Sequence, residues 1–465
     1  MPDVRSSEDI EFDSEVPLVI IGAGAAGLCA ALAASEAGVD AVVIERDAVP
    51  SGSTALSAGL IPAAGTRFQR ERGIEDSAKR FAEDISRKSH GEADAKLVQA
   101  VATSAGPTVE WLADSCDMPF EVITDFNYPG HSAHRMHGLP NRTGAELIDR
   151  LRSAAEARDI PILTGRVCET LFADHDGFIE GVGISGETIG CGALVLACNG
   201  YGGNPELVRR YIPEMADALY FGHPGNRGDA VLWGEALGAR VASLSGYQGH
   251  GSVATPHNIL ITWAAITGGG FQVNREGRRF HNEALGYSEA AAQVLGQPGG
   301  IAFDIFDERI AGVARQFEDF RNAEKQGALI TAQTLDELAS RIGVPTDALT
   351  SEANVGLGKP DRFGRVFENK LAAPFCAIKV TGALFHTQGG LAVDARARVL
   401  RRNGRPFENL FAAGGAAVGV SGSQASGYLS GNGLLTATVL GRIAGTARRN
   451  SEIGWLLLTS PAISS

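Results

Sequence analysis

Residues 16–47 contain the feature that most constrains the fold. A short apolar run, residues 16–21, leads into Gly22-Ala23-Gly24-Ala25-Ala26-Gly27, and an alanine-rich segment follows. A second apolar run, residues 41–44, ends on Glu45. The order of apolar run, glycine turn, alanine-rich segment and apolar run predicts a strand, a turn, a helix and a parallel strand.

The glycines and the acid of this unit each have a physical task. Gly22 permits a tight turn after the strand, Gly24 lets backbone amides approach a pyrophosphate, and Gly27 lets the helix lie close to the sheet. The helix N-terminus then favours the phosphates. Glu45 stands where a carboxylate at the end of the second strand accepts the hydroxyls of a ribose. The unit therefore predicts dinucleotide binding.

Length and charge narrow the class of protein. A chain of 465 residues is too long for one ordinary core, which predicts two domains or one domain with an insertion. The net charge of −13 disfavours nucleic acid and anionic membrane surfaces as partners. The six cysteines form no CxxC motif, and we find neither a signal peptide nor an apolar run of membrane-spanning length. We therefore expect a cytoplasmic protein without a membrane span.

Changes in composition suggest the domain boundaries. Residues 1–15 are polar and are expected to form a flexible tail, and residues 16–242 to form the first part of the dinucleotide-binding domain. From 243 to 365 the sequence has fewer strand-like runs, so this segment is predicted to be an inserted second domain. The first domain is expected to resume over 366–450, before a C-terminal tail at 451–465.

Residues 127–137 combine three histidines with proline and glycine. They could be metal ligands or a polar surface. No acidic partners stand at metal-ligand spacing, so we favour a surface or pocket rim and predict no metal site. A second GxGxxG, residues 181–186, has no helix after it and does not indicate a separate nicotinamide-dinucleotide site.

Several dispersed patterns together resemble the fumarate reductase and 3-ketosteroid dehydrogenase flavoproteins. These are the GAGAAG motif with Glu45, the turn at 196–203, Gly228-Asp229, residues 273–283, and the closing segments 410–414 and 430–433. The resemblance implies an α/β fold with an FAD-binding, Rossmann-like domain of the glutathione-reductase type. It also implies an inserted α+β capping domain that covers the flavin, with substrate between the two.

The resemblance implies FAD as the cofactor. Residues 51–59 contain no histidine, which some relatives use for flavin attachment, so we expect non-covalent binding. A helix starting after Gly433 is expected to point its positive end at the flavin. The expected FAD contacts are Gly22, Gly24, Ala25, Ala26, Gly27, Glu45, Arg46, Ser53, Thr54, Ser57, Ala58, Gly59, Val167, Ala197, Cys198, Asn199, Gly200, Asn226, Asp229, Gly414, Gly415, Ser430, Asn432, Gly433 and Leu434.

The positions that matter for substrate differ between the two branches of this family. His250 and His386 look like the two histidines with which fumarate reductases hold a dicarboxylate. Where those enzymes carry a proton-donating and a carboxylate-binding arginine, this chain has Tyr287 and Tyr428. The relay residues expected in 263–266 are also missing. A dicarboxylate site has therefore lost its fixed cations.

Tyrosines at these positions resemble the ketosteroid dehydrogenase branch, and the motif Tyr428-x-Ser430 resembles the members that act on 5α-reduced 3-ketosteroids. The resemblance assigns Tyr428, assisted by Ser430, to the substrate carbonyl and Tyr287 to α-proton abstraction as a phenolate. His250 and His386 would shape the substrate pocket, and Tyr128 is a weaker third candidate. The alternative is that both phenols are core residues with satisfied hydroxyls.

The resulting hypothesis is FAD-dependent α,β-dehydrogenation of a cyclic ketone, either a 3-ketosteroid or a smaller ring such as 4-oxocyclohexanecarboxylate. Compactness favours the small ring, whose carboxylate His250, His386 and Arg135 could accommodate. The alternatives are a fumarate reductase-like enoate reductase and a flavin-binding subunit without catalysis of its own. Oxygen, a quinone and an electron-transfer protein all remain open as electron acceptor.

Overall fold

The computed structural model describes residues 2–125 and 127–446. Its central six-stranded sheet has the order β22-β23-β12-β3-β4-β8, and all neighbours pair in parallel except β22 with β23. The predicted strand, turn, helix and strand are β3 (Leu18–Ile21), α1 (Ala25–Glu36) and β4 (Ala41–Ile44). The other strands are β8 (Ile162–Leu163), β12 (Leu194–Leu196), β22 (Arg398–Leu400) and β23 (Pro406–Ala412).

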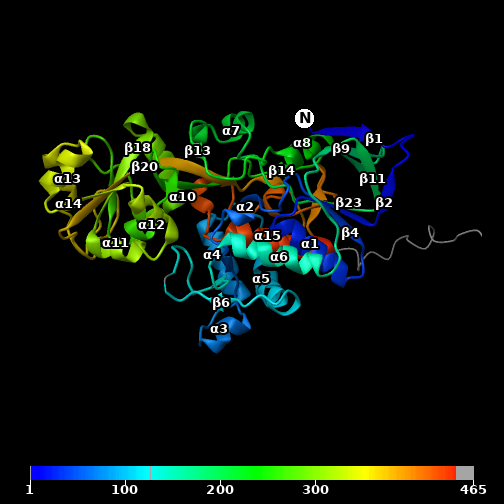
Figure 1. Ribbon diagram of the computed structural model, residues 1–465, viewed down its shortest axis with the longest axis horizontal. Coiled ribbons are helices and arrows are strands. Elements are labelled where there is room, and N and C mark those ends of the chain that lie inside the picture. The colour runs from blue at the N-terminus through cyan, green and yellow to red at the C-terminus, as the bar shows by residue number, and fades with distance from the viewer. Residues whose placement is uncertain (1, 126, 447–465) are drawn as a thin grey trace, which may run out of the picture.

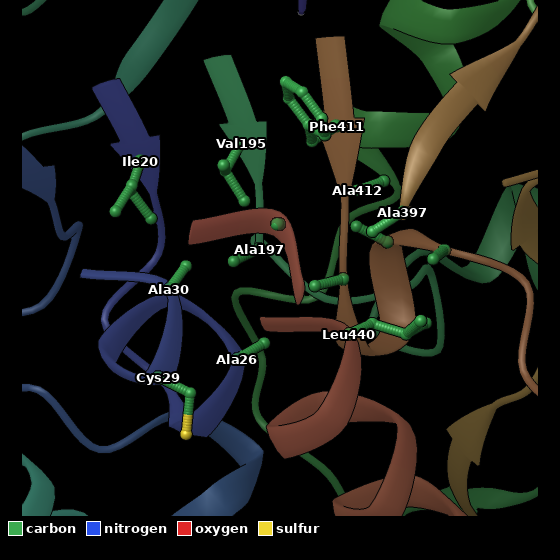
Figure 2. Packing of buried hydrophobic residues seen from close by; sticks show 14 of the residues in the cluster. Ile20, Ala26, Cys29, Ala30, Val195, Ala197, Ala397, Phe411, Ala412 and Leu440 are labelled. Atoms are coloured by element: carbon green, nitrogen blue, oxygen red, sulfur yellow. The ribbon is translucent and has the colours of Figure 1, made fainter. Parts of the chain in front are cut away.

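The main core lies where α1 and α15 (Asn432–Thr446) pack on this sheet (Figure 2). Ile20, Val195 and Phe411 come from three neighbouring strands, while Ala26 and Leu440 come from the two helices. The helices approach closely because their facing residues are small: a methyl group on Gly441 would overlap the backbone of Ala26. Both helices thereby begin beside the carboxyl ends of the central strands.

Seven further helices and a small sheet lie in this part of the described chain. The larger helices are α4 (Ala78–Lys88), α5 (Ala95–Ser115) and α6 (Gly144–Glu156), and the small ones are α2 (Gly52–Ala55), α3 (Arg67–Glu71), α7 (Pro205–Tyr211) and α8 (Asp229–Ala236). The three-stranded sheet consists of β5 (Ile61–Pro62), β6 (Glu121–Val122) and β7 (Met136–Gly138). Asp94 caps α5 by accepting hydrogen bonds from two backbone amides of its first turn.

The N-terminal residues are not the flexible tail that the sequence predicts. β1 (Asp3–Ser6) pairs with β9 (Cys168–Ala173), and β2 (Ser14–Val16) pairs with β11 (Glu187–Cys191). Together with β10 (Ile179–Ile184) they form a five-stranded sheet. Polar residues at these edge positions hid the strands, because only one face of such a strand needs to be apolar. The predicted C-terminal tail lies outside the described residues.

A second lobe extends from the part of the molecule built on the central sheet (Figure 1), and its seven-stranded sheet has β20 (Phe375–Thr387) at its centre. The other strands are β13 (Leu219–Tyr220), β15 (Tyr247–Ala254), β16 (Ile259–Leu260), β17 (Phe271–Val273), β18 (Ile301–Asp307) and β19 (Leu329–Ala332). Its helices are α9 (Ala264–Thr267), α10 (Tyr287–Leu295), α11 (Glu308–Ala314), α12 (Glu318–Lys325), α13 (Leu335–Ile342) and α14 (Thr346–Ala353).

Apart from β13, all the elements of this lobe lie between β14 (Val241–Ala242) and β21 (Gly390–Leu391), which pair with each other. We call the segment between them, residues 243–389, the cap. The predicted boundary at 365 is therefore too early, since β20 pairs with β15, β18 and β19 of the cap. Among the described residues, no helix has the length and apolar character needed to cross a bilayer.

Candidate active site

A cavity of about 1290 Å³ lies between the central sheet and the cap. Its walls include Gly22, Glu45, Ala197 and Gly414, which follow the carboxyl ends of β3, β4, β12 and β23. Ligands of open α/β folds bind at these strand ends. The volume exceeds the roughly 300–1,000 Å³ typical of pockets for one drug-sized ligand, so it suits a dinucleotide together with a small second molecule.

The glycine turn shapes one end of the cavity as a site for phosphate and ribose. The N-cap residue of α1 is Gly24, which has no side chain, and the Ala25 amide donates to the Thr54 hydroxyl at 3.0 Å. The other amides of the first turn remain available for an anion. The carboxylate of Glu45 accepts hydrogen bonds from the amides of Ala23 and Asp47, at 2.8 and 2.9 Å. These bonds fix the carboxylate at the cavity wall and leave further acceptor capacity for ribose hydroxyls.

Twenty of the twenty-five expected cofactor residues line this cavity: Gly22, Gly24, Ala25, Ala26, Glu45, Arg46, Ser53, Thr54, Ser57, Ala58, Ala197, Cys198, Asn199, Asn226, Asp229, Gly414, Gly415, Ser430, Gly433 and Leu434. The lining does not include Gly27, Gly59, Val167, Gly200 or Asn432. Gly27, Gly59 and Gly200 instead let chain segments approach, since added methyl groups would overlap Gly22, Thr143 and Thr387.

Val167 and Asn432 differ from expectation in other ways. The Val167 residue is 39% exposed, so it does not contribute to the cavity wall. Asn432 is fully buried at the start of α15, where its amide nitrogen donates to the Ser421 hydroxyl at 3.0 Å. It therefore supports the site from behind.

Six aromatic or imidazole side chains line the part of the cavity beside the cap. We call them the aromatic group: His250, Trp263, Tyr287, Phe385, His386 and Tyr428. The His250 ring stacks on Tyr287, with ring centroids 4.9 Å apart, and Tyr428 lies edge-on to both Tyr287 and His386, at 6.4 and 5.5 Å. The cap supplies five members, and Tyr428 comes from the segment before α15. The predicted candidates thus meet at one place.

The turn before α10 positions Tyr287, its first residue. The buried Glu283 carboxylate accepts hydrogen bonds from Arg279 and Arg365, at distances between 2.7 and 2.9 Å. It also accepts from the backbone amide of Gln272 on β17, at 3.1 Å. These bonds tie the turn to the cap sheet, and the phenol reaches from the helix start into the cavity.

The hydroxyls of Tyr287 and Ser430 are hydrogen-bonded at 2.9 Å. Ser430, which was expected to assist Tyr428, therefore pairs with Tyr287, because the cap brings α10 onto the segment before α15. Burial raises the pKa of Tyr287 well above 10, and the Ser430 hydroxyl acts against this increase. Burial also raises the pKa of Tyr428, against which the amides of Gly433 and Gly431 act. Both phenols are protonated at neutral pH.

The two histidines are neutral donors. Burial lowers the pKa of His250 to about 3 and that of His386 to about 4. The Nδ1 atom of His250 accepts from the Ser252 amide at 3.1 Å, and the Nδ1 atom of His386 accepts from the side-chain amide of Gln388 at 2.8 Å. Each neutral ring then carries its proton on Nε2.

A chain of hydrogen bonds sets the His386 tautomer. Asn432 donates to Ser421, Ser421 donates to Gln388 Oε1 at 2.7 Å, and the Gln388 amide nitrogen donates to His386. Sequence reasoning missed Gln388 and Ser421, as well as Trp263 and Phe385. Gln388 lies two residues after His386, and this closeness to a predicted pocket residue was the available signal.

The aromatic group contains no charged side chain. Arg135, considered above for a substrate carboxylate, is fully buried and its guanidinium bonds Asp76 and Asp84 at 2.6–3.0 Å. The prediction for Arg135 is therefore wrong, because two buried carboxylates already hold its charge. Tyr128 lines the cavity, and burial raises the pKa of its phenol to about 12.

Known proteins with similar sequences support a flavin site in this cavity. The model of the FAD binding domain family matches residues 18–434. The chain belongs to this family. A probable fumarate reductase of Shewanella frigidimarina is 32% identical over 441 residues, covering 92% of this chain and 74% of that protein. The resemblance noted in the sequence is thereby confirmed, and so is FAD as the cofactor of this flavin-dependent oxidoreductase.

Solved structures show the same fold. The open conformation of a flavocytochrome c3 fumarate reductase is 30% identical, with a TM-score of 0.80, and the match covers 94% of this chain and 78% of that one. A 3-ketosteroid-Δ4-(5α)-dehydrogenase of Rhodococcus jostii RHA1, in complex with 4-androstene-3,17-dione, is 24% identical with a TM-score of 0.78. That match covers 97% of this chain and all of the dehydrogenase. The expected α/β flavoprotein fold is confirmed.

Proposed function

We propose that this flavoenzyme binds FAD non-covalently and removes two hydrogens from the α and β carbons of a cyclic ketone. The observation that carries the proposal is the hydrogen-bonded pair Tyr287 and Ser430, facing the cavity with Tyr428 inside an uncharged aromatic group. A reductase that binds a dicarboxylate needs fixed cations at these positions. Two phenols and a hydroxyl suit a ketone instead.

Each hydroxyl has a role in this reaction. The Tyr428 phenol donates a hydrogen bond to the ketone oxygen, which makes the α-hydrogen more acidic. Tyr287 in its phenolate form takes the α-proton, and the Ser430 hydroxyl donates to that phenolate. Bound FAD supplies the acceptor for the β-hydride. The Nε2–H groups of His250 and His386 offer neutral donors for an oxygen elsewhere on the substrate.

The character of the walls supports a neutral ring as substrate. Aromatic faces at centroid distances of about 5 to 6.4 Å form an apolar surface, and burial keeps both histidines uncharged. A carboxylate placed here would lose its hydration without gaining a cation. We therefore propose that the substrate is a ketone without a charged substituent near the reacting carbons, such as a 3-ketosteroid or a monocyclic ketone. The keto acid 4-oxocyclohexanecarboxylate is the less favoured substrate.

An anaerobic spectral titration tests the proposal. The purified yellow protein is mixed with a panel of 3-ketosteroids, cyclohexanones and 4-oxocyclohexanecarboxylate, and flavin absorbance is followed. We expect at least one neutral ring ketone to bleach the flavin and to yield the corresponding enone. Bleaching by none of the panel would reject the proposal. Reoxidation by oxygen, a quinone analogue or a soluble one-electron acceptor then distinguishes the possible electron acceptors.

The pH dependence of the Ser430→Ala variant tests the proposed base. Only the phenolate of Tyr287 takes a proton, and its pKa lies well above 10, so kcat/KM should still be rising at pH 9. Removing the Ser430 hydroxyl raises that pKa further, because a hydrogen bond to a charged group contributes roughly 1.5–3 kcal/mol. We expect about 10- to 100-fold lower kcat/KM at fixed pH.

The control for this experiment is Ser245→Ala, which removes an exposed hydroxyl bonded to the Ser423 carbonyl. Its pH profile should match that of the unmodified enzyme. A pH profile of Ser430→Ala that coincides with the control would contradict the role of Tyr287 as a base supported by Ser430.

One observation favours a second candidate, the reduction of a carbon–carbon double bond. Phenols that are protonated at neutral pH can donate a proton to the substrate. The similar protein of Shewanella frigidimarina is itself described as a probable fumarate reductase. In that direction Tyr287 would donate its proton to the α-carbon. Reduced viologen is assayed with fumarate and with a neutral cyclic enone. Faster turnover of fumarate would favour the reductase over the ketone dehydrogenase.

A further inference from the structure

We propose that Lys88, outside the cavity lining, positions the phenol of Tyr287 for proton transfer; this inference rests on the proposed role of Tyr287. Lys88 is the last residue of α4, which belongs to the FAD-binding part. Its ammonium lies 2.6 Å from the Glu289 carboxylate on α10 of the cap. Their side chains are only 18% and 17% exposed, so water screens this pair less than an ordinary surface pair.

Lys88 contacts the chain on both sides of Tyr287, in the turn before α10 and in the first turn of α10. Its Nζ atom donates to the carbonyl of Leu285, two residues before the tyrosine, at 3.3 Å. It also donates to Glu289, two residues after the tyrosine. One ammonium thus spans the start of the helix that carries the phenol, and it fixes that start relative to α4.

The start of α10 needs such a support. Gly286 precedes Tyr287 with φ +144°, a conformation that side-chain-bearing residues rarely adopt, and no side chain caps the helix. The buried Glu283 holds the turn to the cap sheet, but Gly286 separates that anchor from the tyrosine. Among the described residues, Lys88–Glu289 is the only salt bridge that joins the cap to the remainder of the chain.

The position matters because the Tyr287–Ser430 hydrogen bond also joins the two parts. Ser430 precedes α15, whereas Tyr287 moves with the cap. A hydrogen bond weakens steeply when donor and acceptor move apart or lose alignment. Lys88 therefore holds the cap helix at the place where the two hydroxyls meet.

The ion pair also affects the charge near the phenol. The titratable groups facing Tyr287 are Tyr428, Tyr128 and Glu289, while the stacked His250 is neutral. The Glu289 carboxylate raises the pKa of Tyr287, since a nearby negative charge disfavours a phenolate. Lys88 offsets this carboxylate. Its loss should raise the pKa of Tyr287 as well as loosen its position.

Variants of the full-length holoenzyme test the inference. Lys88→Met keeps most of the side-chain volume and removes the charge, and we expect kcat to fall about tenfold, with KM changed less than about twofold and flavin content unchanged. The rising limb of the pH profile should move to higher pH. Lys88→Arg should restore most of kcat, and Glu289→Gln should move the limb to lower pH.

The matched control is Lys79→Met on the same helix, whose side chain is 87% exposed. It should leave kcat and the pH profile unchanged. If Lys88→Met also leaves both unchanged, the inference is overturned. A fall in flavin content or thermal stability that explains the whole loss of kcat would assign Lys88 a structural role and overturn it too.

The test of Lys88 can be interpreted even if the proposed ketone dehydrogenation is wrong. If the unmodified enzyme oxidises no ketone, the same variants are compared in viologen-driven enone reduction, where Tyr287 is the proton donor. The pKa of the phenol is also measured without turnover, from the tyrosinate absorbance that Tyr287→Phe removes. An unchanged pKa in Lys88→Met, together with an unchanged rate in either direction, rejects the inference.

Discussion

Replacing Tyr287 by phenylalanine should lower kcat by about 10²- to 10⁴-fold while the protein stays yellow, since positioned acid–base groups contribute rate factors of this size. The substitution removes one oxygen and keeps the ring that stacks on His250. The residues expected to contact FAD near α1 are unchanged. Stopped-flow reduction of the flavin by a ring ketone, together with the flavin-to-protein absorbance ratio, measures both effects.

A suitable control is Tyr211→Phe, which removes a phenol hydroxyl bonded to Glu235, outside the cavity lining. Its rate of flavin reduction should equal that of the unmodified enzyme. If Tyr287→Phe reduces its flavin as fast as this control, the phenol is a packing residue and the dehydrogenation proposal loses its base.

Gly27→Ala should cause the largest loss of stability and of cofactor. A methyl group at Gly27 would overlap the Gly22 carbonyl oxygen, so α1 would have to move away from the glycine turn. We expect a cost of about 3 kcal/mol in the free energy of unfolding, at the upper end for overpacking. FAD content should fall as well, because the amides at the helix start would leave the phosphate position. Urea unfolding and flavin absorbance measure the two effects.

A glycine-to-alanine substitution at an open helix position should instead increase the free energy of unfolding. Gly312 lies exposed in α11 with no atom near its Cβ position. Gly312→Ala should raise the free energy of unfolding by about 0.5–1 kcal/mol, since alanine favours a helix more than glycine. If Gly27→Ala and Gly312→Ala were equally stable, close packing at Gly27 would not determine how α1 packs against the glycine turn.

The sequence predicted the features that depend on neighbouring residues. The spacing of Gly22, Gly24, Gly27 and Glu45 specifies a strand, turn, helix and strand by local geometry, and the structure contains all of them. Tyr287 and Tyr428 could also be placed beside one cavity, because each stands at a fixed distance from a recognisable motif. The family and its fold follow from the same motifs.

Features that depend on contacts between distant segments were not predictable in this way. Arg135 looked available for a substrate, but Asp76 and Asp84, more than fifty residues away, neutralise it. Ser430 was assigned to its sequence neighbour Tyr428, whereas the cap presents Tyr287 to it across 143 positions. β20 was assigned to the wrong domain, since a strand's sequence does not state which sheet it joins.

The central cap strand β20 has a mechanical consequence. It runs for thirteen residues and ends beside the cavity at Thr387. His386, the residue before this end, lies directly opposite Gln248 on β15, two residues before His250. Both imidazoles are thus attached to one stiff pair of strands, together with the α10 helix that packs on them. A substitution deep in this lobe would tilt three groups that line the cavity, His250, His386 and Tyr287, as a unit. Tyr428 and Ser430, which precede α15, would keep their place beside the central sheet.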